Sequence, residues 1–548
     1  MEKTEQTCLP AIVTDYINAA VKTMRYRKKI QQEVREELTA HFADALANCT
    51  NDEQRNTLAK AIIIDFGDVR LLGKLMRRAK KRCRPLWQTA VVRMFQAVGV
   101  LFVLLLLYVG WFFTGKPIIT TNYLEVMNRQ VRPVAEDSQN AWPYYKQAAE
   151  CYGVDCADKE FDNSPRNLSM LTPKDRQVLD EWIADNQKSL DLIRQGNQKP
   201  YCWQVYETGS ESEDVTSMID VLLPHLAAYR DLTRLYCWQA MVAAEKGDMR
   251  QAFDYTFEAY SFGQHLRGQN TPLIEQLVAI AIEGSSTGTM RLLLKEYPQS
   301  IDAEMSKVIR ERFGEIVANE NYEVSLGGEK VFIYDEIQRC FTQTRLGNSH
   351  LYLQRVGKYW LGFEGYEETT KTMFHLLFTH PDREQTLADA DRFYNALEEI
   401  MGQTPGSLHT QQIDVNARID EIAGQNLLLK FMAPALDKVI QISYRNQVDS
   451  VATLTLLATF QYQKMQGDWP ASLEVLVQDG LLSKVPVDPF ADAPLVYKKT
   501  DDGFTLYSVG LNFTDDGGIT GTDGQGKPKN PWGENGDAVF WPVPVIKQ

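Results

Sequence analysis

The sequence lacks the short motifs by which many enzymes and metal proteins are recognised. No H-E-x-x-H pair, no phosphate-binding Walker loop and no cysteine spacing of the zinc-binding type occurs in its 548 residues. Charged residues form 24% of the chain and apolar residues 44%, so wholesale disorder and collagen-like, mucin-like or polytopic membrane architectures are excluded. No group of residues predicts a catalytic site, and we expect a protein that is not an enzyme.

Positive charge is scarce outside the first part of the chain. Residues 1–93 hold 18 Lys and Arg against 11 Asp and Glu, a net charge of +7, whereas the remaining residues hold 40 against 61, a net charge of −21. A boundary near residue 93 therefore separates a basic head from an acidic body. The negative charge of the body argues against nucleic acid as its partner, because it would repel the phosphates.

This boundary coincides with a long apolar run. Residues 94–113 contain no charged side chain, and twenty helical residues rise about 30 Å, the thickness of the hydrocarbon core of a bilayer. Eight basic residues lie between positions 74 and 93, whereas only Lys116 follows closely on the other side. The positive-inside rule predicts a single transmembrane helix with the N-terminus in the cytoplasm and the body outside it. Because no apolar h-region precedes the run, we expect an uncleaved signal anchor.

The spacing of apolar residues predicts a small helical bundle in the head. Four helices are expected, over residues 12–24, over 30–46, from a cap at Asn51 or Asp52 to Gly67, and over 69–78.

The segment from about residue 12 to residue 80 resembles the HAAS or permease-prefix type of cytoplasmic head. The resemblance rests on a helix of the type EVREELTAHFADAL, a helix ending in DFGDVRLLGKLM, a basic stretch and then a membrane helix. Such heads precede membrane segments in many bacterial proteins and are regarded as signalling or interaction modules without catalysis. The resemblance therefore implies a bacterial cytoplasmic (inner) membrane, a periplasmic body and a cytoplasmic regulatory partner for the head.

Residues 114–446 alternate helical patterns with short turns. Helices are expected over residues 221–244, 249–266, 273–294, 303–319, 382–401 and 413–444. A Lys246-Gly247-Asp248 turn joins the first two into an αα-hairpin that resembles a tetratricopeptide (TPR) unit, although the 34-residue spacing signature is not kept. We expect an exterior helical-hairpin array, an architecture that presents concave binding surfaces.

One segment of this body matches a catalytic motif in form. Residues 284–288 read GSSTG, which fits the G-x-S-x-G nucleophile elbow around Ser286. That motif needs a strand before it, whereas the preceding residues have helical periodicity. We expect small residues inside a helix at a close packing contact.

The pairing of the exterior cysteines is left open by the sequence. Cys151 and Cys156 would close the shortest loop, and Cys202 with Cys237 is a second candidate pair. Cys340 makes the number odd, so at least one thiol stays unpaired. In a compartment that is not oxidising, all five would be buried apolar residues.

Composition changes again after residue 446. A helix is expected over 447–466, followed by Gly467-Asp468-Trp469-Pro470, a short helix over 472–478, and a tail rich in Gly, Pro and Asp. Two apolar segments, 495–497 and 504–507, flank a Thr500-to-Gly503 turn and predict a β-hairpin.

The part from about residue 452 to residue 541 resembles the globular part of type II secretion major pseudopilins. It carries, in order, the motifs GDWPASLEVLV, VPVDPFADAPLVYK, GFTLYSVGLNFTDDGG and GDAVFW. The resemblance implies an α+β module. In pseudopilins the membrane helix continues into this module behind a prepilin cleavage site, whereas here the apolar run lies more than 300 residues upstream and no such site occurs. The resemblance therefore implies a grafted module.

The same resemblance implies a calcium site in the loop from Asn512 to Asp523. Read by itself, the loop has oxygen-bearing residues at positions 1, 3, 5, 9 and 12 and Gly at position 6, which echoes the spacing of an EF-hand loop. A metal-free turn cluster is the alternative, because Asp and Gly are common in turns. The predicted calcium ligands are Asn512, Thr514, Asp515, Asp516, Asp523 and Asp537.

Together these patterns predict a mainly α protein in four parts: a helical head (1–93), a transmembrane helix (94–113), an exterior helical array (114–446) and an α+β module (447–548). We expect a single-pass envelope scaffold that binds an envelope or membrane protein through its exterior parts. The alternative hypothesis is a transmembrane signalling receptor that couples exterior ligand binding to the head. An exported hydrolase and a filament subunit are further hypotheses.

Overall fold

The computed structural model describes the chain except for residues 1–8, 83–85, 154–165, 208–216, 222, 319–320, 344–349, 361–377, 425, 433–435, 523–530 and 544–548. The described residues are mainly helical, with two small antiparallel sheets close to the C-terminus. They divide into two compact units, residues 1–111 and residues 112–548. The mainly α class predicted from the sequence is therefore confirmed.

The head forms a helical bundle with a hydrophobic core of its own. Its helices are α1 (Ala11–Met24), α2 (Lys28–Leu46), α3 (Asp52–Phe66) and α4 (Val69–Arg82). The Asn51 side chain caps α3 by accepting a hydrogen bond from the Glu53 amide at 3.1 Å, and Gly67 ends this helix at a φ of 74°. All buried core residues of the head lie between Val13 and Ala59, and the partly buried side chains packed on them extend to Met76. The core of the head, as far as the structure describes it, thus lies within residues 1–82.

The apolar run belongs to helix α5 (Leu86–Phe112), which begins earlier than the sequence predicts. Two helices of the described residues are long and apolar enough to cross a membrane: Ala90–Phe112 within α5, with a mean hydropathy of 2.4, and α12 (Leu273–Glu296), with 1.2. In α5 an apolar stretch of 18 residues contains no buried residue. In the corresponding 18-residue stretch of α12, 67% of the residues are buried inside the protein. Because its apolar side chains are already covered, α12 is a core helix.

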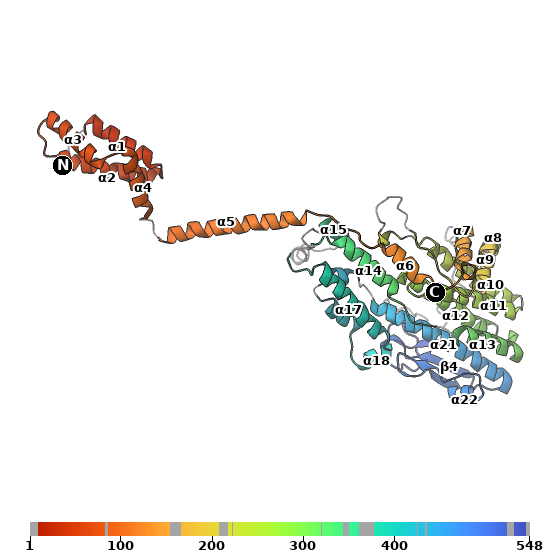
Figure 1. The fold of residues 1–548 in the computed structure, drawn as a ribbon. Helices are drawn as coiled ribbons and strands as arrows, with labels where there is room; N and C mark the ends of the chain where they lie inside the picture. Colours follow the sequence, from red (N-terminus) through yellow and green to blue (C-terminus); the bar gives the residue numbers. More distant parts are fainter. Residues whose placement is uncertain are drawn as a thin grey trace. The chain divides into compact units, whose positions relative to one another are not determined.

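The second unit contains the remaining helices (Figure 1). They are α6 (Tyr123–Val131), α7 (Trp142–Cys151), α8 (Pro173–Asp185), α9 (Gln187–Asn197), α10 (His225–Glu245), α11 (Met249–Leu266), α12, α13 (Ala303–Ala318), α14 (Gly327–Cys340), α15 (Leu353–Trp360), α17 (Arg383–Met401), α18 (Pro405–Thr410), α19 (Val415–Ala423), α20 (Leu427–Met432), α21 (Leu436–Gln466) and α22 (Leu473–Gln478).

The sequence locates the central helices well. Helix α11 has the predicted bounds, and α10, α12, α13 and α17 agree within a few residues. In the turn between α10 and α11, Gly247 adopts a φ of 85°, which favours glycine, and the Asp248 carboxylate accepts a hydrogen bond from the Gln251 amide at 3.0 Å. Helix α12 then packs against α11, and a Cβ atom at Gly263 would lie only 2.8 Å from Cγ of Glu283.

Two predicted helix bounds near the C-terminus are wrong. The expected helix over 413–444 is replaced by α19, α20 and the first part of α21, because α19 ends at Gly424, which has a φ of 55°. The helix expected to begin at residue 447 begins at Leu436. The expected border between residues 446 and 447 thus falls inside a continuous helix of 31 residues.

Helix α21 joins the helical array to the C-terminal residues. Figure 1 shows it beside α12 and α13 and next to β4, and it contacts all three. Its residues Ala452 and Leu456 belong to one hydrophobic core together with Phe253 of α11 and Phe504 of β4. The array and the C-terminal part therefore bury their apolar side chains in a shared core.

The C-terminal part contains two antiparallel sheets. Strands β1 (Val487–Asp488) and β2 (Ala493–Pro494) form one pair, and β3 (Val496–Thr500), β4 (Gly503–Ser508) and β5 (Ala538–Trp541) form the other sheet in that order. Thr500 pairs with Gly503 at the turn between β3 and β4, so the predicted hairpin is confirmed.

Candidate functional site

The predicted calcium loop leaves the sheet after β4 and returns to it at β5. Phe513, Gly517 and Gly518 have φ values of 58°, 77° and 89°, which turn the chain sharply. The loop is closed where the Asp537 amide donates a hydrogen bond to the Ile519 carbonyl at 2.8 Å. The described part of this loop, residues 512–522, is therefore shaped by these three residues and fixed to the start of β5 by this backbone hydrogen bond.

Asp537 is the buried anchor of this loop. One carboxylate oxygen accepts a hydrogen bond from the Asp516 amide at 3.2 Å, and the other accepts one from the Gly518 amide at 2.6 Å. Burial raises the pKa of the Asp537 carboxyl, these two hydrogen bonds lower it, and the charges of Asp515 and Asp516 raise it further. The three carboxylates are thus close enough to influence one another.

The other described residues among the predicted ligands already form hydrogen bonds with protein groups. Asp515 accepts hydrogen bonds from the Tyr507 hydroxyl at 2.7 Å and the Gly517 amide at 2.9 Å. The hydrogen bond from Tyr507 is the main reason why the pKa of the Asp515 carboxyl is lowered. Asp516 accepts a hydrogen bond from the Asn512 amide group at 2.7 Å, and the Thr514 backbone amide donates to Asn512 Oδ1 at 3.1 Å.

The structure brings Asn512, Thr514, Asp515, Asp516 and Asp537 into one turn cluster. Asp523 lies outside the described residues. Within the described part of the chain, no group of three or more His, Cys, Asp or Glu side chains is arranged to hold a metal ion. Each described carboxylate instead accepts hydrogen bonds from the protein, and calcium binding stays a prediction.

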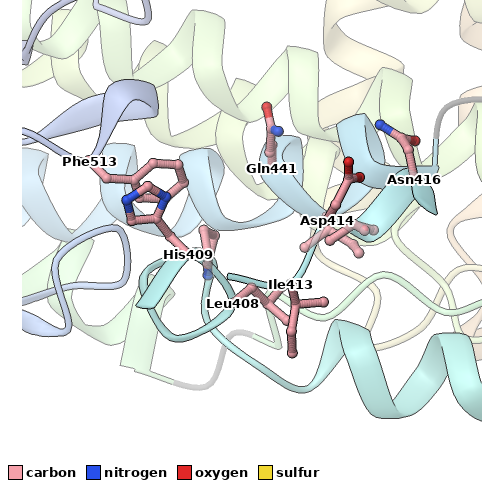
Figure 2. Close-up of a pocket in the computed structure, with 10 residues that line it drawn as sticks. Leu408, His409, Ile413, Asp414, Asn416, Gln441 and Phe513 are labelled. Atoms are coloured by element: carbon pink, nitrogen blue, oxygen red, sulfur yellow. The ribbon is translucent and has the colours of Figure 1, made fainter. Parts of the chain in front are cut away.

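A pocket of about 220 Å³ opens beside this loop (Figure 2). Its lining comes from α18, the connection to α19, the start of α19, α21 and the loop: Pro405, Leu408, His409, Ile413, Asp414, Val415, Asn416, Ile440, Gln441 and Phe513. The His409 ring stacks on the Phe513 ring at a centroid distance of 4.2 Å and an angle of 10°. This stack joins α18 to the predicted calcium loop, because Phe513 is the second residue of that loop.

Helix α18 was not predicted, although its start carries a recognisable signal. Thr404 caps the helix by accepting a hydrogen bond from the Ser407 amide at 3.1 Å, and Pro405 occupies the first helical position. The helix is fastened to the β1–β2 turn, because the Gly406 amide donates to the Pro489 carbonyl at 2.9 Å. A Cβ atom at Gly406 would lie 2.8 Å from the Phe490 carbonyl oxygen, so this close approach requires glycine.

The pocket combines an apolar interior with polar residues at the surface. Leu408 and Ile440 are buried, whereas His409, Asp414 and Asn416 are exposed. The Asp414 carboxylate caps α19 by accepting a hydrogen bond from the Ala417 amide at 3.0 Å. At about 220 Å³ the pocket is smaller than most sites for metabolites or cofactors, which have about 300–1,000 Å³. Its size and lining suit a single apolar or aromatic side chain.

A second cluster surrounds the buried carboxylate of Glu275 on α12. Gln204 donates a hydrogen bond to one carboxylate oxygen, and the Tyr206 hydroxyl donates to the other at 2.8 Å. His225 Nε2 lies 3.8 Å from the carboxylate. The adjoining cavity has a volume of about 20 Å³, which is room for about one water molecule. This cluster therefore fastens the segment around residue 204 to α12 and has no space for a substrate.

The G-x-S-x-G segment lies inside helix α12, as predicted. The Ser286 hydroxyl is fully buried and donates a hydrogen bond to the Ile282 carbonyl at 2.9 Å, one turn earlier. The expected close packing contact does not occur at the two glycines: a Cβ atom at Gly284 would meet nothing within 4 Å, and one at Gly288 would meet only Arg291 at 4.0 Å. The Ser286 hydroxyl is therefore not accessible to a substrate as a nucleophile would have to be.

Four of the five cysteines after residue 113 are free thiols in the described part of the chain, Cys151, Cys202, Cys237 and Cys340, and Cys156 lies outside the described residues. The candidate pair Cys202 and Cys237 is not joined by a disulfide. The Cys237 thiol is fully buried and donates to the Ser285 carbonyl at a distance of 3.7 Å. Burial raises the pKa of the Cys237 thiol to about 11, so it is neutral at physiological pH.

Comparisons of the chain with protein-family models, with curated proteins and with solved structures find no match.

Proposed function

We propose that the protein is a single-pass membrane-anchored scaffold that binds a protein partner outside the cytoplasm. The observation that carries the proposal is the apolar segment Ala90–Phe112, in which an apolar stretch of 18 residues contains no buried residue. Arg93 is its only charged residue. Exposed apolar surface of this length is unfavourable in water and matches the thickness of a bilayer. The basic head and the acidic body then lie on opposite sides, with the head in the cytoplasm.

The pocket beside Phe513 is the proposed binding site for the partner. It lies on the proposed exterior unit, and its apolar lining suits a side chain presented by another protein. Its polar residues include Asp414, Asn416 and Gln441, whose groups can form hydrogen bonds with the backbone of the partner. The imidazole of His409 is stacked on Phe513 and the carboxylate of Asp414 caps α19, and we propose that the pocket binds a partner without catalysis.

Site-specific photocrosslinking in cells tests the binding site. The photoreactive residue p-benzoylphenylalanine is introduced at Asn416, which lines the pocket, and separately at Lys307, an exposed residue of α13. We expect a covalent adduct of defined mass at position 416 that is weakened by His409→Glu, because the charge and the loss of the ring stack alter the pocket. Equal adducts at both positions, or an adduct insensitive to His409→Glu, would contradict the site.

Membrane anchoring is tested on the full chain by alkaline extraction of cell membranes. We expect the protein to stay in the membrane pellet and to be released when Leu104→Arg and Leu105→Arg interrupt the apolar segment. Protease added to cells with a permeabilised outer layer should digest the body and spare the head. Digestion of the head instead would show the reverse orientation.

A transmembrane signalling receptor is the second candidate function. It is favoured by the hydrophobic core that the head has of its own, which allows the head to respond as one unit to a change in α5. A single helix transmits a signal only by changing its association, tilt, rotation or axial position. Crosslinking of heads that depends on the exterior partner would favour the receptor, whereas partner-independent crosslinking would favour the scaffold.

A further inference from the structure

Helix α4 carries an unusual surface directly before the proposed membrane segment. Seven of its fourteen residues are basic and none is acidic. Its apolar side chains divide into two groups. Val69, Leu72 and Met76 are partly buried and pack on the core of the head, whereas Leu71 and Leu75 are 58% and 51% exposed. Exposed leucines four residues apart lie on one face of a helix.

The orientation of this face is fixed by the head itself. A Cβ atom at Gly73 would lie 2.9 Å from the Ala20 carbonyl oxygen, so α4 is pressed closely against α1. Lys80 forms an ion pair with Glu37 of α2 at 2.6 Å. These contacts hold the opposite face of α4 towards solvent. In a helical projection that face contains Leu71 and Leu75 together with the exposed basic residues Arg70, Lys74, Arg78, Lys81 and Arg82.

Chain length limits how far the end of α4 can lie from the bilayer once α5 is inserted. Seven residues separate Arg82 from Ala90, where the membrane segment begins. At about 3.3–3.6 Å for each residue, even a fully extended chain would place the end of α4 within about 30 Å of the bilayer. The exposed indole of Trp87 lies in the same interval, where interfacial aromatic residues are common.

We propose that α4 lies on the cytoplasmic surface of the membrane, with Leu71 and Leu75 in the head-group region and the basic residues on anionic lipid phosphates. A basic amphipathic helix with a narrow apolar edge has the composition of interfacial helices, and anionic lipids supply the opposite charge. The proposal rests on the proposed insertion of α5. It assigns to the head a lipid-binding surface that holds it in a defined orientation next to the membrane.

Vesicle flotation with residues 1–82 tests the proposal, since this fragment contains all the described core residues of the head. The probes are vesicles of phosphatidylcholine alone and vesicles containing 30% phosphatidylglycerol. We expect binding to the anionic vesicles that is at least about tenfold stronger than to the neutral ones and weakens in high salt. The double variant Leu71→Ser and Leu75→Ser should reduce this binding about tenfold without a change of charge. Leu58→Ser on α3, whose leucine is 39% exposed, is the matched control and should bind normally.

Three results would overturn the proposal. They are the absence of binding to anionic vesicles, equal binding to both kinds of vesicle, and full binding by the Leu71→Ser and Leu75→Ser variant. Helical circular dichroism of each variant shows whether it has folded, and Leu71→Ala with Leu75→Ala provides a second, more conservative pair. Because the fragment lacks α5, failure here is independent of the alkaline extraction that tests membrane anchoring of the full chain.

Discussion

The indole nitrogen of Trp532 donates a hydrogen bond to the carboxylate of Asp449 at 3.1 Å. Asp449 lies in the middle of α21, and its other oxygen is 3.1 Å from the guanidinium of Arg291 on α12. The contact therefore connects the C-terminal segment, α21 and the helical array through one buried carboxylate. Burial raises the pKa of the Asp449 carboxyl, whereas the charge of Arg291 and the hydrogen bond from Trp532 lower it.

We predict that Asp449→Ala lowers the free energy of unfolding of the second unit, residues 112–548, by about 3–5 kcal/mol, because it leaves the buried guanidinium of Arg291 without this carboxylate. Trp532→Phe removes only the indole donor and should cost about 1–3 kcal/mol. Urea unfolding followed by circular dichroism measures both. Glu421→Ala, in an exposed pair with Arg418, is the control and should change stability by less than about 0.5 kcal/mol. A small effect of Asp449→Ala would show that the buried carboxylate does not join these parts.

His265 should make the stability of the second unit sensitive to acid. Its Nδ1 lies 2.5 Å from the Tyr145 hydroxyl, which donates its own proton to Asn197 Oδ1 at 2.7 Å. Neutral His265 therefore donates from Nδ1 to Tyr145. Burial lowers the pKa of His265 to about 4, below the usual value near 6.5, so the unfolded chain binds this proton more readily. The free energy of unfolding should thus fall as pH decreases from about 6.5 to 4, by at most about 3 kcal/mol.

The measurement compares the wild type with His265→Gln in urea at pH 7.5 and pH 4.5. The amide of glutamine can donate to Tyr145 and does not titrate. The contributions of all other titrating groups to the pH dependence therefore cancel when the free energies of unfolding of the two proteins are subtracted. We expect the wild type to lose stability relative to the variant at the lower pH. A difference that is independent of pH would show that protonation of His265 does not oppose folding.

The Cys237 thiol should resist alkylation in the folded protein. With a pKa of about 11 and no exposed surface, its reactive thiolate is rare and inaccessible at pH 8. We expect maleimide to modify Cys237 at least about a hundredfold more slowly before unfolding in urea than after it, as read by peptide mass spectrometry. If the cysteine stays unmodified in urea until a reductant is added, Cys237 is in a disulfide, and its assignment as a free thiol is wrong.

Calcium should stabilise the C-terminal loop if the resemblance to pseudopilins extends to metal binding. We predict that millimolar calcium raises the melting temperature of a fragment of residues 118–548, and that a chelator reverses this rise. Asp516→Ala and Asp523→Ala should abolish the effect, whereas Asp502→Ala in the exposed β3–β4 turn should preserve it. No shift at millimolar calcium would favour the metal-free turn cluster.

The sequence by itself determined the features that depend on near neighbours along the chain. The uncharged run of α5, the bounds of α11, the Asn51 cap and the β3–β4 hairpin follow from apolar periodicity, capping residues and turn residues, all of which act within a few positions. Such signals are local because helix hydrogen bonds and tight turns join residues only a few positions apart.

Only the tertiary structure decided how α21 and the candidate site are built. Asp449 and Trp532 are 83 positions apart, and the stack of His409 on Phe513 spans 104 positions, so no local pattern reveals either contact. The sharp change of composition near residue 446 indicates a border, yet α21 continues through it. The apolar residues of α21 are buried against both the helical array and the sheet. Because helical stability in proteins comes mainly from such tertiary packing, this shared core favours one continuous helix.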